Sequence, residues 1–217
     1  EAYGLADAIA KLTGWLKVRP KSWDLCLLLG NLHVQADQVS QGIEIYRKAL
    51  GFADKANQKV EATVRIGGAY YRLGKLREAE KAYLAALKIV PNHAPTLNNL
   101  AYLYVNDMNQ PAKALPHSAL AFKQMPYDRN ILDTYGWVLA ALGDYGKAER
   151  SLNRSLQMGR PMPPSLYHLG WVYEKTGRVT QAHLRYQQAL KLLADGKDDR
   201  LRQAVNKALE RLKKRKG

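Results

Sequence analysis

A small residue, Gly or Ala, recurs five times along this chain at nearly constant spacing, each time on an apolar stripe of helical period. The five positions, separated by 37, 34, 35 and 34 residues, are Gly30, Gly67, Ala101, Gly136 and Gly170. A second apolar stripe, centred on Ala and in most cases Tyr, follows each of them. A period of about 34 residues is that of a repeated helix-turn-helix unit. The spacing therefore predicts an all-α chain of stacked helix pairs, each burying its apolar face against its neighbours.

The repeat that begins at Val60 shows the pattern clearly. Its first stripe holds Gly67, its turn holds Gly74, and its second stripe holds Tyr83 and ends at Pro91. A side chain larger than a methyl group at Gly67 would hold two crossing helices apart, so a small residue is needed there. Gly74 can adopt the positive φ that ends the first helix, and proline lacks the donor needed to continue the second. Each repeat is therefore predicted to fold as two antiparallel helices.

These residues resemble the tetratricopeptide repeat, whose unit combines Leu-Gly-x-x-Tyr in a first helix with Ala-x-x-x-Tyr-x-x-Ala and a closing Pro in a second. The resemblance implies a right-handed α-solenoid of about five units. We place their bounds at about 23–59, 60–93, 94–128, 129–162 and 163–194. Ser118 and Leu152 stand where the family usually has an aromatic residue. The third and fourth repeats are also loosely similar to bacterial envelope and exopolysaccharide-export members of the family.

Two further segments flank the five repeats. Residues 1–20 have the spacing of a repeat's second helix with its closing proline, which predicts either the remainder of an upstream repeat or a helix that caps the array. Residues 198–217 are predicted to form a basic capping helix with a basic tail, because apolar residues recur there at helical spacing.

Positive charge dominates the composition. The chain carries 34 Lys and Arg against 19 Asp and Glu, a formal charge of +15. Such a field attracts polyanions, acidic proteins or anionic membranes without choosing among them. In the last segment we expect either a contact with nucleic acid, acidic lipid or an acidic partner, or a solvated helix end. The candidates for that basic C-terminal contact are Arg200, Arg202, Lys207, Arg211, Lys213, Lys214 and Arg215.

The first helices of such arrays line a concave wall, and residues near each small Gly or Ala point into it. This spacing predicts a set of partner-binding side chains on the concave face. They are Asn31, Arg65, Arg72, Asn98, Asn99, Tyr102, Asp133, Trp137, Tyr167, Trp171 and Glu174.

Three aromatic residues of that set, Tyr102, Trp137 and Trp171, occupy equivalent positions in consecutive repeats. They predict a continuous aromatic track of the kind that forms hot spots at protein interfaces. The alternative is that these side chains pack against the next repeat and close the superhelix. Periodicity alone does not decide between the two.

Side chains for catalysis are scattered rather than grouped. The five histidines lie in different repeats without metal-ligand spacing, and Cys26 sits on an apolar stripe. The sequence has no phosphate-binding Gly-rich loop, no nucleophile elbow and no apolar run of the roughly 20 residues that cross a bilayer. We therefore expect no catalysis, no cofactor and no bound metal.

The sequence as a whole predicts a non-catalytic scaffold that binds a peptide, helix or loop of a partner protein, in the assembly or secretion of a multiprotein complex. One alternative is a targeting or substrate-recruiting repeat domain of a larger enzyme. Others are binding of nucleic acid or an anionic surface through the basic face, and self-association into a homo-oligomer. The loose resemblance to envelope proteins favours the bacterial cell envelope or periplasm over the cytoplasm, without fixing the location.

Overall fold

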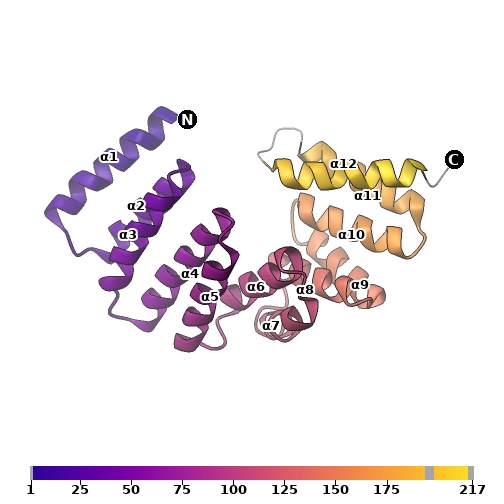
Figure 1. Cartoon of the computed structure of the whole chain (residues 1–217), viewed down its shortest axis with the longest axis horizontal. Coiled ribbons are helices and arrows are strands. Elements are labelled where there is room, and N and C mark those ends of the chain that lie inside the picture. Colours follow the sequence, from indigo (N-terminus) through magenta and orange to yellow (C-terminus); the bar gives the residue numbers. More distant parts are fainter. Residues whose placement is uncertain (1, 194–197, 215–217) are drawn as a thin grey trace. The chain divides into compact units, whose positions relative to one another are not determined.

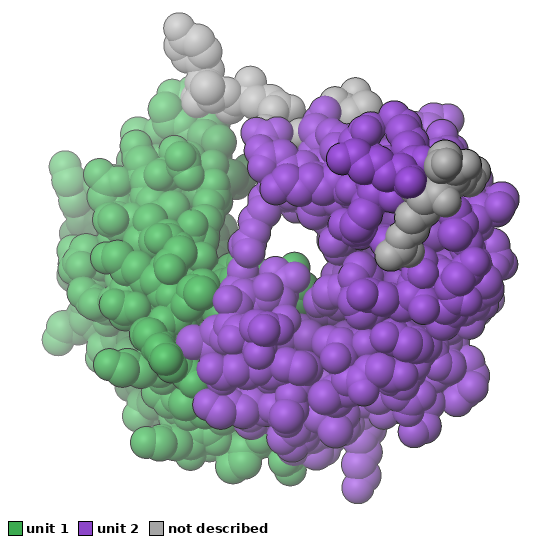
Figure 2. Space-filling view, turned by 45° about the vertical axis from the view of Figure 1, so that its right-hand side comes forward, with its two compact units in different colours: residues 1–103 green, residues 104–217 purple. Residues whose placement is uncertain are grey.

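The computed structural model describes residues 2–193 and 198–214 of the chain (Figure 1). All regular structure in these two ranges is helical, and the ranges contain no strand. The all-α prediction is confirmed. The chain divides into two compact units, an N-terminal unit of residues 1–103 and a C-terminal unit of residues 104–217, coloured green and purple in Figure 2.

The N-terminal unit consists of six helices in which consecutive helices pack side by side. The helices are α1 (Ala2–Val18), α2 (Trp23–Gln35), α3 (Val39–Gly51), α4 (Ala56–Arg72), α5 (Leu76–Ile89) and α6 (Ala94–Tyr102). The most extensive contacts join α2 to α3 and α4 to α5, which are the two helix pairs that the repeats predict. The flanking helix α1 packs on α2, and α6 packs on α5.

The C-terminal unit repeats this arrangement. The π-helical turn η1 (Leu103–Asp107) crosses the boundary between the units, and the helices that follow are α7 (Pro111–Gln124), α8 (Arg129–Ala141), α9 (Tyr145–Gln157), α10 (Pro163–Lys175), α11 (Val179–Leu192) and α12 (Asp199–Lys214). Helices α8 and α9 form one pair and α10 and α11 the next. The last helix, α12, packs on α10 and α11 and buries one face, with Val205, Ala208 and Leu212 inside.

Three of the four recurrent glycines make room for a tyrosine ring on the second helix of their pair, and the fourth, Gly136, makes room for Leu152. A Cβ atom built on those three glycines would lie 2.5 to 2.7 Å from the tyrosine ring that follows 16 residues later, closer than carbon atoms approach. The pairs are Gly30 with Tyr46, Gly67 with Tyr83, and Gly170 with Tyr186. The small residue therefore sets the depth to which the tyrosine ring enters the pair.

The turn inside each repeat contains one residue of positive φ. These residues, with φ between 52° and 86°, are Asp37, Gly74, Asn109, Gly143 and Gly177. Asp and Asn tolerate the left-handed region better than most other residues, so they can replace glycine there. The third repeat has one extra residue, which the π-helical turn η1 accommodates. The backbone hydrogen bond that closes this turn therefore spans six residues, from the Gln110 N–H to the Tyr104 carbonyl.

Candidate functional site

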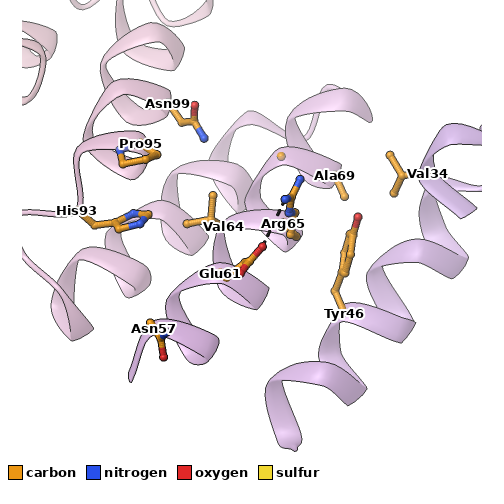
Figure 3. A pocket seen from close by; sticks show the side chains of 11 residues that line it. Val34, Tyr46, Asn57, Glu61, Val64, Arg65, Ala69, His93, Pro95 and Asn99 are labelled. Atoms are coloured by element: carbon orange, nitrogen blue, oxygen red, sulfur yellow. Dashed lines mark hydrogen bonds and ion pairs between the residues drawn. The ribbon is translucent and has the colours of Figure 1, made fainter. Parts of the chain in front are cut away.

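A groove of about 600 Å³ lies in the N-terminal unit, over the first helices of three successive repeats (Figure 3). Helices α2, α4 and the start of α6 line it, and α3 contributes Tyr46. Two of the predicted partner-binding residues, Arg65 of α4 and Asn99 of α6, are among its lining residues. These two residues therefore lie at a hollow of the surface, and their contact with a partner stays a prediction.

The centre of the groove is a loose ion pair. Arg65 Nη2 lies 3.4 Å from Glu61 Oε1, and the two side chains are 48% and 45% exposed. An exposed pair at this distance contributes little to stability, about 0.3–0.5 kcal/mol for neighbours on one helix. Both charged groups can therefore turn toward another molecule at small cost.

One wall of the groove is the beginning of α6. His93 is the N-cap residue of this helix, and Pro95 follows as a residue of its first turn. His93 Nδ1 lies 2.7 Å from the Thr96 hydroxyl. Desolvation lowers the pKa of His93, partly opposed by the nearby carboxylate of Glu61. Burial therefore favours the neutral imidazole, and its Nε2 can exchange a hydrogen bond with a ligand.

The opposite wall contains Tyr46, whose hydroxyl donates a hydrogen bond of 2.7 Å to Oδ1 of Asn31. Burial raises the pKa of Tyr46. Asn31, another predicted residue, is half-buried and oriented by this bond. Asn98 is also half-buried, and its Oδ1 atom is buried with no hydrogen-bond donor among the described residues.

Arg72, also predicted as a partner contact, joins two repeats. Its Nη1 donates to the carbonyl of Val34 at 2.6 Å and its Nη2 to Oδ1 of Asp37 at 3.0 Å. This guanidinium joins the end of α4 to the turn of the preceding repeat.

Tyr102, another predicted partner contact, packs its ring edge-on against the ring of Tyr71, with centroids 6.3 Å apart.

In the C-terminal unit, Trp137 and Trp171 pack against each other at right angles, with ring centroids 5.2 Å apart. The Trp137 ring also stacks on the ring of His168, with centroids 4.3 Å apart. The centroid of the Tyr167 ring lies 6.4 Å from that of Trp137. The two indoles and Tyr167 are half-buried. These rings contribute to packing between α8 and α10 and keep part of their surface exposed.

Two predicted contacts of this unit lie in its interior. Asp133 is 5% exposed, and its Oδ1 lies 3.0 Å from Nδ1 of the buried His168. Glu174 is 6% exposed and accepts hydrogen bonds from Tyr186 and Arg211. Because both carboxylates are inside and bonded to the chain itself, we do not keep Asp133 and Glu174 in the proposed partner surface.

Three arginines of α12, Arg200, Arg202 and Arg211, bind other parts of the chain. Arg200 pairs with the buried Asp107 at 2.7 Å, and Arg202 donates to the carbonyl of Leu193. Within α12, the Lys213 ammonium lies 2.7 Å from the Glu210 carboxylate. The remaining members of the predicted contact are Lys207 and Lys214, both exposed, Arg211, bound to Glu174, and Arg215, which lies outside the described residues.

Sequence reasoning missed Glu61 and Asn57, which line the groove from the same face of α4 as Arg65. They precede Arg65 by four and eight residues, so extending the helical period from Arg65 would have found them. His93 and Tyr46 could not be found this way, because they lie on a turn and on a second helix.

No group of three or more His, Cys, Asp or Glu side chains among the described residues is placed to hold a metal ion. None of the described helices has the length and apolar character of a membrane-spanning segment.

Two segments of the chain match sequence models of one family. Residues 60–93 and residues 165–201 each match a tetratricopeptide repeat. No curated protein matches the sequence. With its paired helices and small-residue crossings, this chain is a tetratricopeptide repeat protein. Stacked repeats of this kind form interaction scaffolds.

Solved structures share the fold at low sequence identity. YrrB, described as a TPR protein with an unusual peptide-binding site, is 19% identical with a TM-score of 0.59, over 90% of this chain and 97% of that one. TTC0263, a thermophilic TPR protein of Thermus thermophilus, is 23% identical with a TM-score of 0.68, over 87% and 99%. The APC/C hetero-tetramer Cut9–Hcn1 is 16% identical with a TM-score of 0.82, over 100% of this chain and 40% of that one.

Proposed function

We propose that this chain binds an extended segment of a partner protein in the groove over α2, α4 and α6. The observation that carries the proposal is the groove itself, a hollow of about 600 Å³ to which three successive first helices contribute. A volume in the range of roughly 300–1,000 Å³ is typical of binding pockets. The peptide-binding site described for YrrB, a protein of the same fold, supports this choice of ligand.

The chemistry of the groove suits a polar, extended ligand. Asn99 offers both a donor and an acceptor to a peptide main chain, and His93, whose Nδ1 bonds Thr96, offers one further hydrogen bond through Nε2. Arg65 can exchange its weak pairing with Glu61 for a carboxylate of the ligand, to which a guanidinium binds in bidentate geometry. We therefore expect the bound segment to carry an acidic side chain opposite Arg65.

Binding of this kind would serve the assembly of a multiprotein complex, and we propose that role for the chain. The hetero-tetramer described for Cut9–Hcn1, which contains a protein of the same fold, is consistent with it. A role in secretion and a place in the bacterial cell envelope remain proposals that rest on the sequence resemblance.

The proposal is tested with peptides selected from a display library against the intact chain and measured by fluorescence anisotropy. Replacing both Arg65 and Asn99 by Ala should weaken binding by at least about tenfold, which corresponds to about 1.4 kcal/mol. The matched control is Arg77→Ala on α5, because Arg77 is 73% exposed and lies outside the groove. Equal losses in the two variants would contradict the proposed site.

A further inference from the structure

A second hollow, of about 390 Å³, lies in the C-terminal unit between α9 and α11. These are the second helices of two successive repeats, whereas the groove of the N-terminal unit lies on first helices. This hollow is separate from the site proposed above.

The floor of this hollow is apolar. Leu156 of α9, Leu166 of α10 and Leu192 of α11 line it, together with Pro161 from the loop before α10. Leu166 is 2% exposed, so the floor is fixed by the core, whereas Leu192 is 48% exposed at the edge. A hollow of this size with an exposed leucine at its edge can accommodate one or two apolar side chains of another molecule.

The rim of the hollow is cationic. Arg185 and Lys191, both on α11, line it beside the apolar floor. Arg185 Nη1 donates to the Gln188 amide oxygen at 3.0 Å, and neither cation forms an ion pair with a carboxylate of the described residues. Arg178 in the same unit, by contrast, binds Glu149 through two hydrogen bonds of 2.8 Å. The two rim cations therefore keep charge available to a ligand.

The surrounding unit strengthens this field. Residues 104–217 contain 20 Lys and Arg against 10 Asp and Glu, which gives a net charge of +10. A ligand with negative charge is attracted to such a surface and a positive one is repelled.

We propose that the hollow between α9 and α11 binds a short acidic segment of a partner protein. A Leu or Phe side chain of this segment fills the apolar floor, and flanking carboxylates reach Arg185 and Lys191. The apolar floor selects a peptide with an anchor side chain over a simple anion, and the cationic rim selects Asp and Glu over Lys and Arg in the flanks. The chain then has two separate peptide-binding surfaces, one in each compact unit.

The probe is an array of short peptides that each contain one Leu or Phe among Glu residues, with the Leu or Phe at each position in turn. In two matched arrays, Gln or Lys replaces Glu. We expect the intact chain to bind members of the Glu array and not their Gln or Lys counterparts. The double variant Arg185→Glu with Lys191→Glu should bind the Glu peptides at least about tenfold more weakly and should acquire binding to the Lys peptides.

The matched control reverses two exposed cations elsewhere in the same unit, Arg150→Glu with Lys207→Glu, so the net charge changes equally. A second variant, Leu192→Asp, should also lose the Glu peptides, because it places a carboxylate beside the floor. The inference is overturned if no Glu peptide binds, if the control loses as much affinity as the rim variant, or if Gln peptides bind as well. Vesicles of anionic lipid that bind through Arg185 and Lys191 in place of any peptide would also overturn it.

Discussion

The carboxylate of Glu174 accepts hydrogen bonds from Nε and Nη2 of Arg211, each 2.8 Å long, and so joins α10 to α12 across 37 residues of sequence. The Glu174 side chain is 4% exposed and also accepts a bond of 2.9 Å from the Tyr186 hydroxyl. The hydrogen bonds that Arg211 donates to Glu174 raise the pKa of Arg211, and burial is the main cause of the raised pKa of Tyr186. This cluster anchors the last helix to the last repeat.

Replacing Arg211 by Met should lower the free energy of unfolding by about 2 kcal/mol, because a buried carboxylate loses its charged partner. The loss is smaller than for a wholly buried pair, since the Arg211 side chain is 48% exposed. Urea denaturation measures the change, and adding Glu174→Gln to the variant should recover part of it. The control Lys214→Met removes an equal charge from exposed surface and should change stability by less than about 0.5 kcal/mol. Equal effects of the two substitutions would show that the Glu174 cluster does not hold α12.

Two neighbouring glycines of α4 should respond in opposite ways to alanine. A Cβ atom on Gly67 would lie 2.6 Å from the ring of Tyr83, whereas on Gly68 the nearest atom would be the Tyr83 hydroxyl at 3.9 Å. Gly67→Ala should therefore destabilise the chain by about 1–3 kcal/mol through overpacking. Gly68→Ala should stabilise it by up to about 1 kcal/mol through helix propensity. Thermal and urea unfolding of the two variants provide the comparison, and a stabilising Gly67→Ala would contradict the packing described for each repeat.

Burial raises the pKa of Tyr83 from 10.0 to about 12. Below pH 10 the phenol is protonated in both the folded and the unfolded chain, so its contribution to stability is fully present. As the pH rises from 10 to 12 the unfolded chain loses this proton first, and stability should fall by about 2–3 kcal/mol. Tyr83→Phe removes this one titration and leaves the other alkaline titrations in place. The difference in unfolding free energy between the parent chain and the variant should therefore change over this pH range, and a constant difference would refute the assignment.

The repeats were predictable because the constraint that creates them is local. In three repeats the small glycine and the tyrosine that packs on it lie 16 residues apart, as Gly67 and Tyr83 do, so the crossing of two helices is visible as a spacing. The turn at Gly74 was predictable for the same reason. Asp37 and Asn109 adopt the same positive φ, yet neither residue type identifies such a turn by itself.

The candidate site was predictable only in part, because burial depends on how each repeat stacks on the next. Arg65 and Asn99 line the groove, whereas Asp133 lies inside against His168, which comes from the following repeat. Arg72 likewise faces the turn of the preceding repeat. Helical spacing places a residue on a face of its own helix, and the neighbouring repeat decides whether that face is open.

The central claim, that a partner's peptide occupies the groove of the N-terminal unit, is tested most directly by mapping amide chemical shifts of the isotope-labelled chain during titration with a peptide selected against it. The account predicts that the largest shifts belong to the face of α4 that carries Glu61 and Arg65 and to the start of α6 around His93 and Asn99. Shifts concentrated on α3 and α5, with none at Arg65 or Asn99, would contradict it.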